Sequence, residues 1–541
     1  MAIDDIYTHG MAGGWRVDDA SAFREHRTFE ADVAIVGTGA GGGTAAEILS
    51  AAGLNVLMLE EGALRTSASF KDMQELRAYR ELYQEGGARA SSDGAIAILQ
   101  GRTVGGSTVV NFTSSFRTPP QTLAHWAAEY GIKGAGEAEM APWFAAMEAR
   151  LGVARWAAEP NANNAALRRA CERLGWEWHV IPRNVRGCWN SGYCGLGCPV
   201  NAKQSMLVTT VPAALKNGAR LIHHVRVERV TFDNGRITGL VGRALDAQCI
   251  EPTGITVEVR AKHYILAGGA LNTPALLLRS NAPDPHARIG KRTTIHPITL
   301  SMARMPDKVD GYYGAPQSIA SDEFQWKHED PSRSSYKIEV APVFPALASG
   351  MMRFQERALT QDMAELPYMQ CMGVMLRDGF HDESQGGVVR ISDDGFPVLD
   401  YDVTDYQWRG IRHAMLSLTD AQFAAGAERV MPVHMDSTWY PSARSARQAI
   451  AGLSMKKFRT PLFTAHLMGG CAMGEDPKRA VVDSEGRFHG VGNLSAFDGS
   501  VFPTSIGNNP QLSIYAMTAK NATALAKSLG GKPVEPGAGA N

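Results

Sequence analysis

The chain has 541 residues, which is too long for one simple hydrophobic core and therefore predicts two domains. Its hydrophobic content of 44% and charged content of 20% are typical of a soluble globular protein. Lys and Arg together number 54 against 55 for Asp and Glu, so the near-zero net charge gives no reason to expect nucleic acid or an anionic membrane as a partner.

The N-terminal stretch carries acids where a secretory signal has a basic region followed by an apolar run. No segment approaches 18 consecutive apolar residues, so we expect no membrane span. Three of the seven cysteines crowd into residues 188–198, which does not resemble a secreted disulfide framework. We therefore expect a cytoplasmic chain, and export together with a signal-bearing partner subunit stays open.

The first sixty residues predict a polar tail and then a βαβ unit. The first thirty residues are polar and irregular, as in a tail laid over the body. Residues 31–36 form a short apolar run that ends in glycines, as a buried parallel strand does. Residues 44–52 have a helical pattern that Gly53 ends, and residues 54–59 predict a second strand. A unit of this size is expected at the start of a dinucleotide-binding fold.

Beyond this unit the pattern is mixed. Residues 66–100 are polar and predict an excursion or lid, and residues 126–180 have a helical pattern. Residues 219–267 are rich in β-type segments, and residues 300–460 mix strands and helices without a recognisable motif. Residues 529–541 predict a loose tail.

The segment GTGAGG at 37–42 matches G-x-G-x-x-G directly between the predicted strand and helix. Gly37 allows the tight turn, Gly39 lets a pyrophosphate approach the backbone, and Gly42 lets the helix pack on the strand. The helix N-terminus then directs free N–H groups at the phosphates. Glu60 ends the second strand, where its carboxylate can accept hydrogen bonds from ribose hydroxyls. These features predict a nucleotide cofactor, and the motif alone does not choose between NAD and FAD.

Three further stretches follow in the chain. They are GRTVGGSTVVN at 101–111, LAGGALNTP at 266–274, and a C-terminal pair formed by HLMGGCAMG from His466 and FDGSVFPT from 497 with GNNP from 507. Together with the first motif they resemble the glucose–methanol–choline oxidoreductase family, in the order of that family. The resemblance covers most of the chain and implies an FAD-dependent alcohol dehydrogenase or oxidase.

The resemblance implies an α/β fold. A Rossmann-like FAD-binding domain is expected from the discontinuous segments 1–125, 200–300 and 461–541. An α+β substrate domain, with an antiparallel sheet over the flavin, is expected from 126–199 and 301–460.

Several residues are implied as cofactor contacts. In the second stretch these are Gly105, Gly106, Ser107 and Asn111, and Asp498 belongs to the closing motif. Val227 stands where the backbone of family members contacts the adenine.

Family members that bind FAD covalently through histidine carry that residue just before the loop asparagine. This sequence has Val110 there, which predicts non-covalent FAD.

The same resemblance assigns a catalytic pair, His466 and Asn509. Oxidation of an alcohol removes a hydroxyl proton and a hydride, and imidazole can accept the proton near neutral pH. An amide can hold the same oxygen by a hydrogen bond. The implied reaction passes the proton to His466 and the hydride to flavin N5. The other histidines, including His296, are expected in surface or core positions.

The cysteine run places Cys188, Cys194 and Cys198 within eleven residues. Three thiolates could hold an iron–sulfur cluster, and the run is similar to those of the family's sugar dehydrogenases and long-chain alcohol oxidases. The spacing C-x5-C-x3-C differs from standard cluster spacings. The alternatives are a buried trio of thiols, or one disulfide and a free thiol.

The leading interpretation is oxidation of an apolar or aromatic primary alcohol, with electrons passing to a quinone, a cytochrome or oxygen. The substrate class follows from Met and aromatic residues in 300–460, for example Tyr312, Tyr313, Met351, Met352 and Phe354. The alternatives are an FAD-containing lyase of the hydroxynitrile-lyase type and a sugar dehydrogenase that relays electrons through an iron–sulfur cluster.

Overall fold

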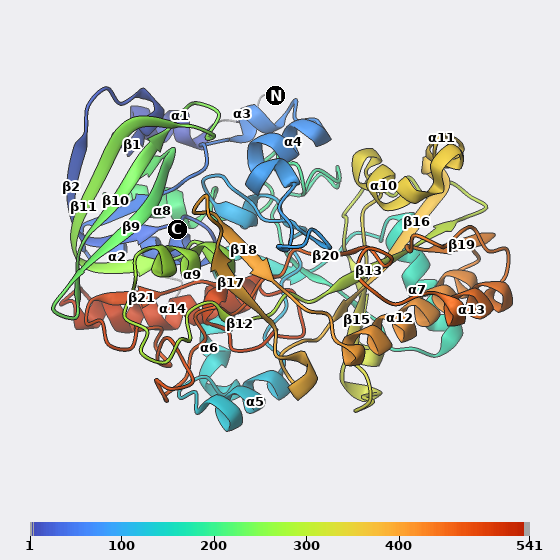
Figure 1. Ribbon diagram of the computed structural model, residues 1–541. Coiled ribbons are helices and arrows are strands. Elements are labelled where there is room, and N and C mark those ends of the chain that lie inside the picture. Colours follow the sequence, from blue (N-terminus) through green and yellow to red (C-terminus); the bar gives the residue numbers. More distant parts are fainter. Residues whose placement is uncertain (1–2, 4, 535–541) are drawn as a thin grey trace.

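The computed structural model describes residues 3 and 5–534. These residues form two eight-stranded sheets, a three-stranded sheet and a two-stranded sheet. Figure 1 shows the two large sheets in opposite halves of the molecule, the first on the left and the second on the right. Within the described part of the chain, no helix is both long and apolar enough to cross a membrane.

The first large sheet is parallel on one side and antiparallel on the other. Its strands are β1 (Arg16–Asp19), β2 (Arg27–Val36), β3 (Val56–Leu59), β8 (Arg220–His223), β9 (Val225–Asp233), β10 (Arg236–Leu245), β11 (Pro252–Leu266) and β21 (Leu494–Ala496). The order is β1-β8-β3-β2-β11-β10-β9, and β21 also pairs with β11. The neighbours from β1 to β11, and β21, are parallel, whereas β11, β10 and β9 form an antiparallel meander.

The predicted βαβ unit is confirmed, with a first strand that begins four residues earlier than expected, at Arg27. Helix α2 (Ala40–Ala51) follows the first strand and is buried along most of its length. Helix α14 (Gln511–Ser528), red in Figure 1, runs beneath this half of the molecule and packs against α2. Every residue of β3 is buried, as expected for a strand covered on both faces.

The predicted N-terminal tail is wrong. Helix α1 (Ile6–Ala12) and strand β1 occupy this segment, and β1 pairs in parallel with β8. The Tyr7 ring is fully buried, and its hydroxyl donates to the Leu207 carbonyl at 2.9 Å. Only isolated side chains of the segment face the core, so no hydrophobic periodicity marks its two short elements.

The second large sheet is mostly antiparallel. Its strands are β4 (Ile96–Ile98), β6 (His179–Val180), β13 (Ile298–Arg304), β14 (Ile319–Ser321), β15 (Tyr336–Val340), β16 (Met369–Leu376), β19 (Arg429–Pro432) and β20 (Leu462–Thr464). The order is β4-β20-β13-β16-β15-β14-β6, and β19 also pairs with β13. In the centre, Leu300 of β13 is paired with Gly373 of β16. Along each strand, the side chains of successive residues point to opposite faces of the sheet.

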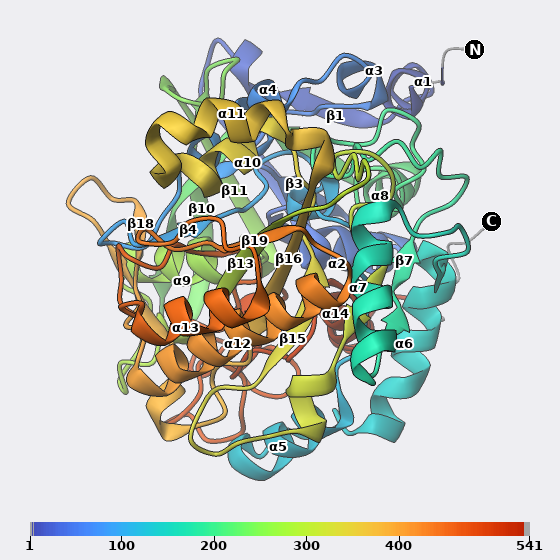
Figure 2. The ribbon, with the colours of Figure 1, turned by 90° about the vertical axis from the view of Figure 1, so that its right-hand side faces the viewer.

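Helices cover one face of the second sheet. Figure 2 shows α12 (Asp405–Ala424) and α13 (Ala443–Gly452) in front of it and α7 (Ala162–Leu174) beside them. Ile338 and Val374 of the sheet share a core cluster with Ile411 and Met415 of α12. The opposite face carries Leu300, and α10 (Pro345–Met352) packs over its outer end. The apolar inner face of the sheet is thereby turned toward the first sheet.

The remaining helices and strands lie outside the two large sheets. The helices are α3 (Ser67–Phe70), α4 (Glu75–Leu82), α5 (Pro120–Tyr130), α6 (Glu137–Leu151), α8 (Thr210–Lys216), α9 (Gly269–Arg279) and α11 (Leu359–Ala364). The strands are β5 (Val153–Arg155), β7 (Pro182–Asn184), β12 (Lys291–Thr293), β17 (Gly387–Ile391) and β18 (Pro397–Asp400).

The predicted fold class is confirmed: a Rossmann-like part built from discontinuous segments faces an antiparallel sheet. Strands β4 and β20 come from segments assigned to the cofactor domain, yet they pair in the second sheet. The residue boundaries of the two domains stay a prediction. Of the C-terminal tail expected at 529–541, residues 535–541 lie outside the described part.

Candidate active site

A cavity of about 1050 Å³ lies between the two halves. The predicted site residues that line it are Gly37, Gly39, Glu60, Gly106, Ser107, Asn111, Val227, Asp498, His466 and Asn509. Gly42 and Gly105 do not line the cavity. The structure therefore brings ten of the twelve predicted cofactor and catalytic residues to one cavity.

The first glycine loop fits a phosphate. Gly37 has φ +98°, and a Cβ there would lie 2.4 Å from the Ala267 carbonyl oxygen. A Cβ on Gly42 would lie 1.9 Å from the Gly37 carbonyl oxygen, so the turn and the helix contact require glycine at both positions. A Cβ on Gly39 would meet only the Gly106 Cα, at 3.8 Å. The protein itself thus leaves room at Gly39, the N-cap of α2, where free N–H groups favour an anion.

Thr38 joins both glycine loops to Glu60. The Gly105 N–H donates to Thr38 Oγ1 at 2.9 Å, and Thr38 Oγ1 donates to Glu60 Oε2 at 2.6 Å. The Gly62 N–H donates to the other carboxylate oxygen at 2.9 Å. Burial raises the pKa of Glu60 to about 7. Glu60 therefore fixes the loops, and its contact with a ribose stays a prediction.

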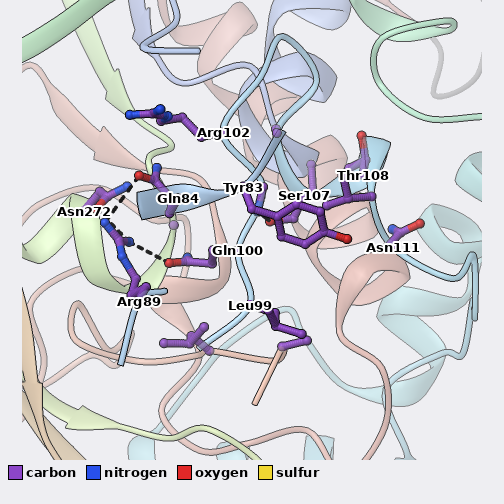
Figure 3. Close-up of a pocket in the computed structure, with 18 of the residues that line it drawn as sticks. Tyr83, Gln84, Arg89, Leu99, Gln100, Arg102, Ser107, Thr108, Asn111 and Asn272 are labelled. Atoms are coloured by element: carbon purple, nitrogen blue, oxygen red, sulfur yellow. Dashed lines mark hydrogen bonds between the residues drawn. The ribbon is translucent and has the colours of Figure 1, made fainter. Parts of the chain in front are cut away.

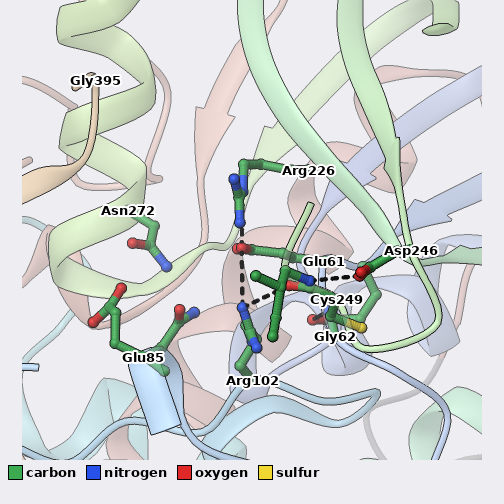
Figure 4. A network of polar contacts seen from close by, with 12 residues as sticks. Glu61, Gly62, Glu85, Arg102, Arg226, Asp246, Cys249, Asn272 and Gly395 are labelled. Carbon is green, nitrogen blue, oxygen red and sulfur yellow. Dashed lines mark hydrogen bonds and ion pairs between the residues drawn. The ribbon is translucent and has the colours of Figure 1, made fainter. Parts of the chain in front are cut away.

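Charged groups gather at the outer end of the cavity, near Val227. Arg226 Nε lies 3.0 Å from Glu61 Oε1, and Arg102 Nη1 lies 3.8 Å from the same oxygen. Arg102 also donates to the Cys249 carbonyl at 2.9 Å, which ties the loop before β11 to the cavity wall (Figure 4). Sequence reasoning missed this network, although Glu61 directly follows Glu60.

Arg89 is a second group that sequence reasoning missed. Its side chain is buried and donates to Gln100 Oε1 at 2.8 Å and to Asn272 Oδ1 at 3.3 Å (Figure 3). It also donates to Glu85 Oε1 at 2.6 Å. Arg89 lies in the predicted excursion 66–100, where no motif marks it.

Asp498 and Asn111 connect distant motifs. The Asp498 carboxylate accepts from the Gly269 N–H at 2.8 Å and from Thr273 Oγ1 at 2.6 Å, and burial raises its pKa. The Asn111 amide donates to Gln511 Oε1 of α14 at 2.7 Å. These contacts explain why motifs from the middle and the end of the chain line the same cavity.

The two predicted catalytic side chains meet on the cavity wall. His466 follows β20, and its backbone N–H donates to Thr464 Oγ1 at 3.0 Å. Its Nε2 lies 3.4 Å from Asn509 Nδ2. Burial lowers the pKa of His466 to about 4, so the ring is neutral at neutral pH.

His296 was expected in a surface or core position, and the structure places its buried ring against His466. The two Nδ1 atoms are 3.4 Å apart. The Gly507 N–H donates to His296 Nε2 at 3.2 Å. Burial and the neighbouring His466 hold the pKa of His296 well below its ordinary value, so this ring stays neutral.

Glu339 of β15 approaches the pair from the second sheet. Its Oε2 accepts from Asn509 Nδ2 at 3.3 Å and from Gln317 Nε2 at 2.8 Å. Burial raises the pKa of Glu339 to about 7. Glu339 Oε1 and Asn509 Oδ1 are buried without a protein partner, which leaves two polar atoms free for a bound molecule. The sequence signal was weak, because Glu339 and Lys337 both stand in this short strand.

Apolar side chains also line this end of the cavity, beside the polar Gln317 and Glu339. The apolar residues are Ile298, Leu300, Leu347, Met351, Met375 and Phe463. Of the five Met and aromatic residues given as examples of the predicted lining, Met351 lines the cavity, and Met375 and Phe396 of the same segment do so too. Met352 packs in the cluster under α10, and Tyr313 is exposed.

The structure does not support an iron–sulfur cluster at the cysteine run. Cys188, Cys194 and Cys198 line one cavity of about 20 Å³, which is room for about one water molecule. Arg183 donates to the Cys194 sulfur, and the Lys203 N–H donates to that of Cys198. All seven cysteines are free, so the disulfide alternative is wrong as well. The run is a compact loop of free thiols.

Comparison with known proteins shows the family of the chain. Two family models described as GMC oxidoreductase match residues 79–298 and 382–518. A GMC-type oxidoreductase of Mycobacterium tuberculosis is 33% identical over 90% of this chain and 74% of its own length. Long-chain-alcohol oxidase FAO4B of Arabidopsis thaliana is 28% identical over 90% of this chain and 66% of its own length.

Among solved structures, pyridoxine 4-oxidase from Mesorbium loti superposes with a TM-score of 0.67 at 20% sequence identity, over 91% of this chain and 98% of its own. A formate oxidase of Aspergillus oryzae superposes with a TM-score of 0.67 at 15% identity, over 92% and 99%. These likenesses confirm the fold. With the family matches and the cavity described above, they identify the chain as a flavin-dependent oxidoreductase of the GMC oxidoreductase family.

Proposed function

We propose that the chain uses non-covalently bound FAD to oxidise an apolar or aromatic primary alcohol to the carbonyl compound. The observation that carries this proposal is the convergence of His466 Nε2 and Asn509 Nδ2, 3.4 Å apart, on the end of the cavity that Leu300, Met351 and Met375 also line. When bound, FAD supplies the hydride acceptor. The protein's own task is to hold the alcohol and to take its proton.

The cavity fits FAD in ways that the chain's own atoms support. Gly39 leaves space at the N-terminus of α2 for a pyrophosphate. Gly106 and Ser107 continue that wall toward His466. Val110 lines the cavity where covalent members of the family carry histidine, so we expect acid denaturation to release the flavin into solution.

His466 accepts the hydroxyl proton. Its ring is neutral above about pH 4, and that is the form able to accept a proton. A base at Nε2 needs the ring proton on Nδ1. The His296 Nδ1 lies 3.4 Å away, longer than the usual range of about 2.7–3.2 Å for a formed hydrogen bond, so His296 does not impose the opposite tautomer. Asn509 holds the alcohol oxygen beside the base.

The apolar wall supports an apolar substrate. Leu300 and Met375 of the second sheet and Met351 of α10 face the cavity near the pair. An apolar chain or ring buried there gains about 25 cal/mol per Å² removed from water. The names of the long-chain-alcohol oxidase relatives agree with this class of substrate.

Anaerobic mixing of the oxidised holoenzyme with a panel of aliphatic, aromatic, steroid and sugar alcohols tests the proposal. Bleaching of the flavin absorbance by aliphatic or aromatic primary alcohols is the expected result. Product formation without bleaching would instead indicate a lyase, and bleaching by sugars alone would overturn the substrate class. Admission of air, then of a soluble quinone or a cytochrome, to the reduced enzyme identifies the electron acceptor.

A further inference from the structure

An aspartate and two adjacent histidines meet at the outer end of the first sheet. Asp19 is the last residue of β1 and His223 is the last residue of β8, and the parallel register pairs these two residues directly. His224 follows with φ +60°, a left-handed conformation that a residue with a Cβ adopts at a cost. Both imidazoles are buried, while the Asp19 carboxylate is half exposed.

Three ligand atoms converge at this point. His223 Nδ1 lies 2.6 Å from His224 Nδ1, and His224 Nδ1 lies 3.1 Å from Asp19 Oδ1. His223 Nδ1 lies 3.9 Å from the same oxygen. Across residues 3 and 5–534, no other set of three or more His, Cys, Asp or Glu ligand atoms lies within 4.8 Å of one another.

A single proton can serve only part of this arrangement. Each ring nitrogen carries at most one proton, so a proton on His224 Nδ1 is donated either to His223 Nδ1 at 2.6 Å or to Asp19 Oδ1 at 3.1 Å. Asp19 Oδ1 also accepts from the Ser21 N–H at 2.9 Å and from Ser21 Oγ at 2.7 Å. A divalent cation would accept one lone pair from each of the three atoms.

We propose that Asp19, His223 and His224 together bind one divalent first-row transition-metal ion. Two imidazole nitrogens and a carboxylate oxygen suit such ions, and Zn²⁺ is the probe of choice. Zinc–ligand bonds of about 2.0–2.2 Å place tetrahedral ligand atoms about 3.3 Å apart. The separation between Asp19 and His224 is already 3.1 Å, and a small rotation of the two rings opens their contact. The exposed side of Asp19 leaves the fourth position to water.

The ion would fasten the sheet edge to the outer end of the cofactor cavity. Strand β1 is the edge of the first sheet and pairs with β8. Directly after His224, the Val225 N–H donates to the Glu60 carbonyl at 2.9 Å, and Val225 lines the cavity. Cys249, beside Arg102 in Figure 4, also contacts His224. The site is thus structural, and it lies apart from His466.

Metal analysis of tag-free holoenzyme tests this inference. After removal of metals by EDTA, Zn²⁺ is titrated in and the bound metal is measured by mass spectrometry. We expect about one zinc per chain and a thermal midpoint raised by about 2 °C or more. Co²⁺ should add absorbance at wavelengths beyond the flavin bands. His224→Gln should lower the zinc content at least about tenfold, because a lost ligand weakens the site more than a lost outer partner does.

Two variants separate a metal site from a hydrogen-bonded cluster. Asp19→Asn keeps a hydrogen-bond acceptor but weakens the ligand, so it should also lose zinc while the flavin content stays unchanged. His286→Ala removes an exposed histidine outside the cluster and should bind zinc as the wild type does. Wild-type protein that takes up less than about a tenth of a zinc per chain, or Asp19→Asn and His224→Gln that bind as the wild type does, would show a hydrogen-bonded cluster only.

Discussion

The Glu339 carboxylate lies 3.3 Å from the Asn509 amide nitrogen, and the two residues belong to opposite halves of the molecule. Glu339 is on β15 of the second sheet, whereas Asn509 directly precedes the N-cap of α14. The same amide nitrogen lies 3.4 Å from His466 Nε2. The amide of Asn509 therefore lies between a carboxyl group and the proposed base.

Replacement of His466 by Ala should slow flavin reduction by the alcohol by about 10²–10⁴-fold, because the alcohol proton then has no acceptor at the reacting oxygen. Anaerobic stopped-flow measurement of the flavin absorbance gives this rate directly. His286→Ala, an exposed histidine outside the cavity, is the matched control and should reduce at the wild-type rate. Near-normal reduction in His466→Ala would remove the histidine from the mechanism.

Glu339 should give the reduction rate a pH dependence near neutrality. Burial raises its pKa to about 7, so the carboxyl is neutral below that pH and ionised above it. The ionised form stabilises the imidazolium that forms when His466 takes the proton. We therefore expect the rate of flavin reduction to rise by roughly tenfold as the pH passes through 7. The rise is modest because polar groups around the site weaken the effect of the Glu339 charge on His466.

Glu339→Gln tests the origin of this dependence. The amide keeps the shape and cannot ionise, so the rise near pH 7 should disappear while the acid limb due to His466, near pH 4, stays. Stopped-flow rates from about pH 3.5 to 9 cover both limbs, and exposed Glu129→Gln serves as the control. A rise near pH 7 that persists in Glu339→Gln would assign it to another group.

The pH dependence of the stability of the apoprotein should also reflect the raised pKa of Glu339. A buried carboxyl whose pKa is raised makes the native state bind more protons than the unfolded state between about pH 4.3 and 7. Its contribution to stability is present below that window and is lost as the pH rises through it, by on the order of 3 kcal/mol. The thermal midpoint of the wild type should therefore fall relative to that of Glu339→Gln between pH 5 and 8. Parallel curves for the two proteins would contradict the raised pKa.

Gly39→Ala should fold and yet bind FAD poorly. The protein leaves room for this Cβ, whose nearest neighbour would be the Gly106 Cα at 3.8 Å, so the methyl group fills only the space assigned to the pyrophosphate. Crowding of that contact should lower flavin occupancy by at least about tenfold. The flavin-to-protein absorbance ratio measures this, and Gly452→Ala, which meets nothing within 4 Å, is the control. Full occupancy in Gly39→Ala would place the phosphates elsewhere.

Local motifs predicted one part of this site, and strand pairing supplied the rest. Gly37, Gly39 and Glu60 could be assigned because a turn, a close approach and a strand end each require a residue type at a fixed spacing. Glu339 and Arg89 could not, since pairing across the second sheet and a loop without a motif bring them to the cavity. Such contacts join residues far apart in sequence and leave no local signal.

At the cysteine run, the sequence suggested a metal site that the structure does not support. Composition suggested a cluster, but Cys188, Cys194 and Cys198 line a space of only about 20 Å³. The residue that organises this loop is Lys203, a lysine that no spacing rule marks. Its buried ammonium donates to the carbonyls of Val109 and Asn111, each at 2.7 Å, and of Cys194 at 2.5 Å. It therefore joins the cysteine loop to the stretch that lines the cofactor cavity.

Lys203→Met should loosen that stretch. The methionine removes the donor of three carbonyl groups, two of them in the predicted flavin-contacting loop, and unpaired buried carbonyls cost about 1–3 kcal/mol each before relaxation. We expect a loss of roughly 2–4 kcal/mol in stability and release of FAD at a lower temperature. Flavin fluorescence during heating measures the release, and Lys216→Met, at an exposed position on α8, is the control. If FAD left both variants at the wild-type temperature, Lys203 would be a packing residue without influence on the cofactor loop.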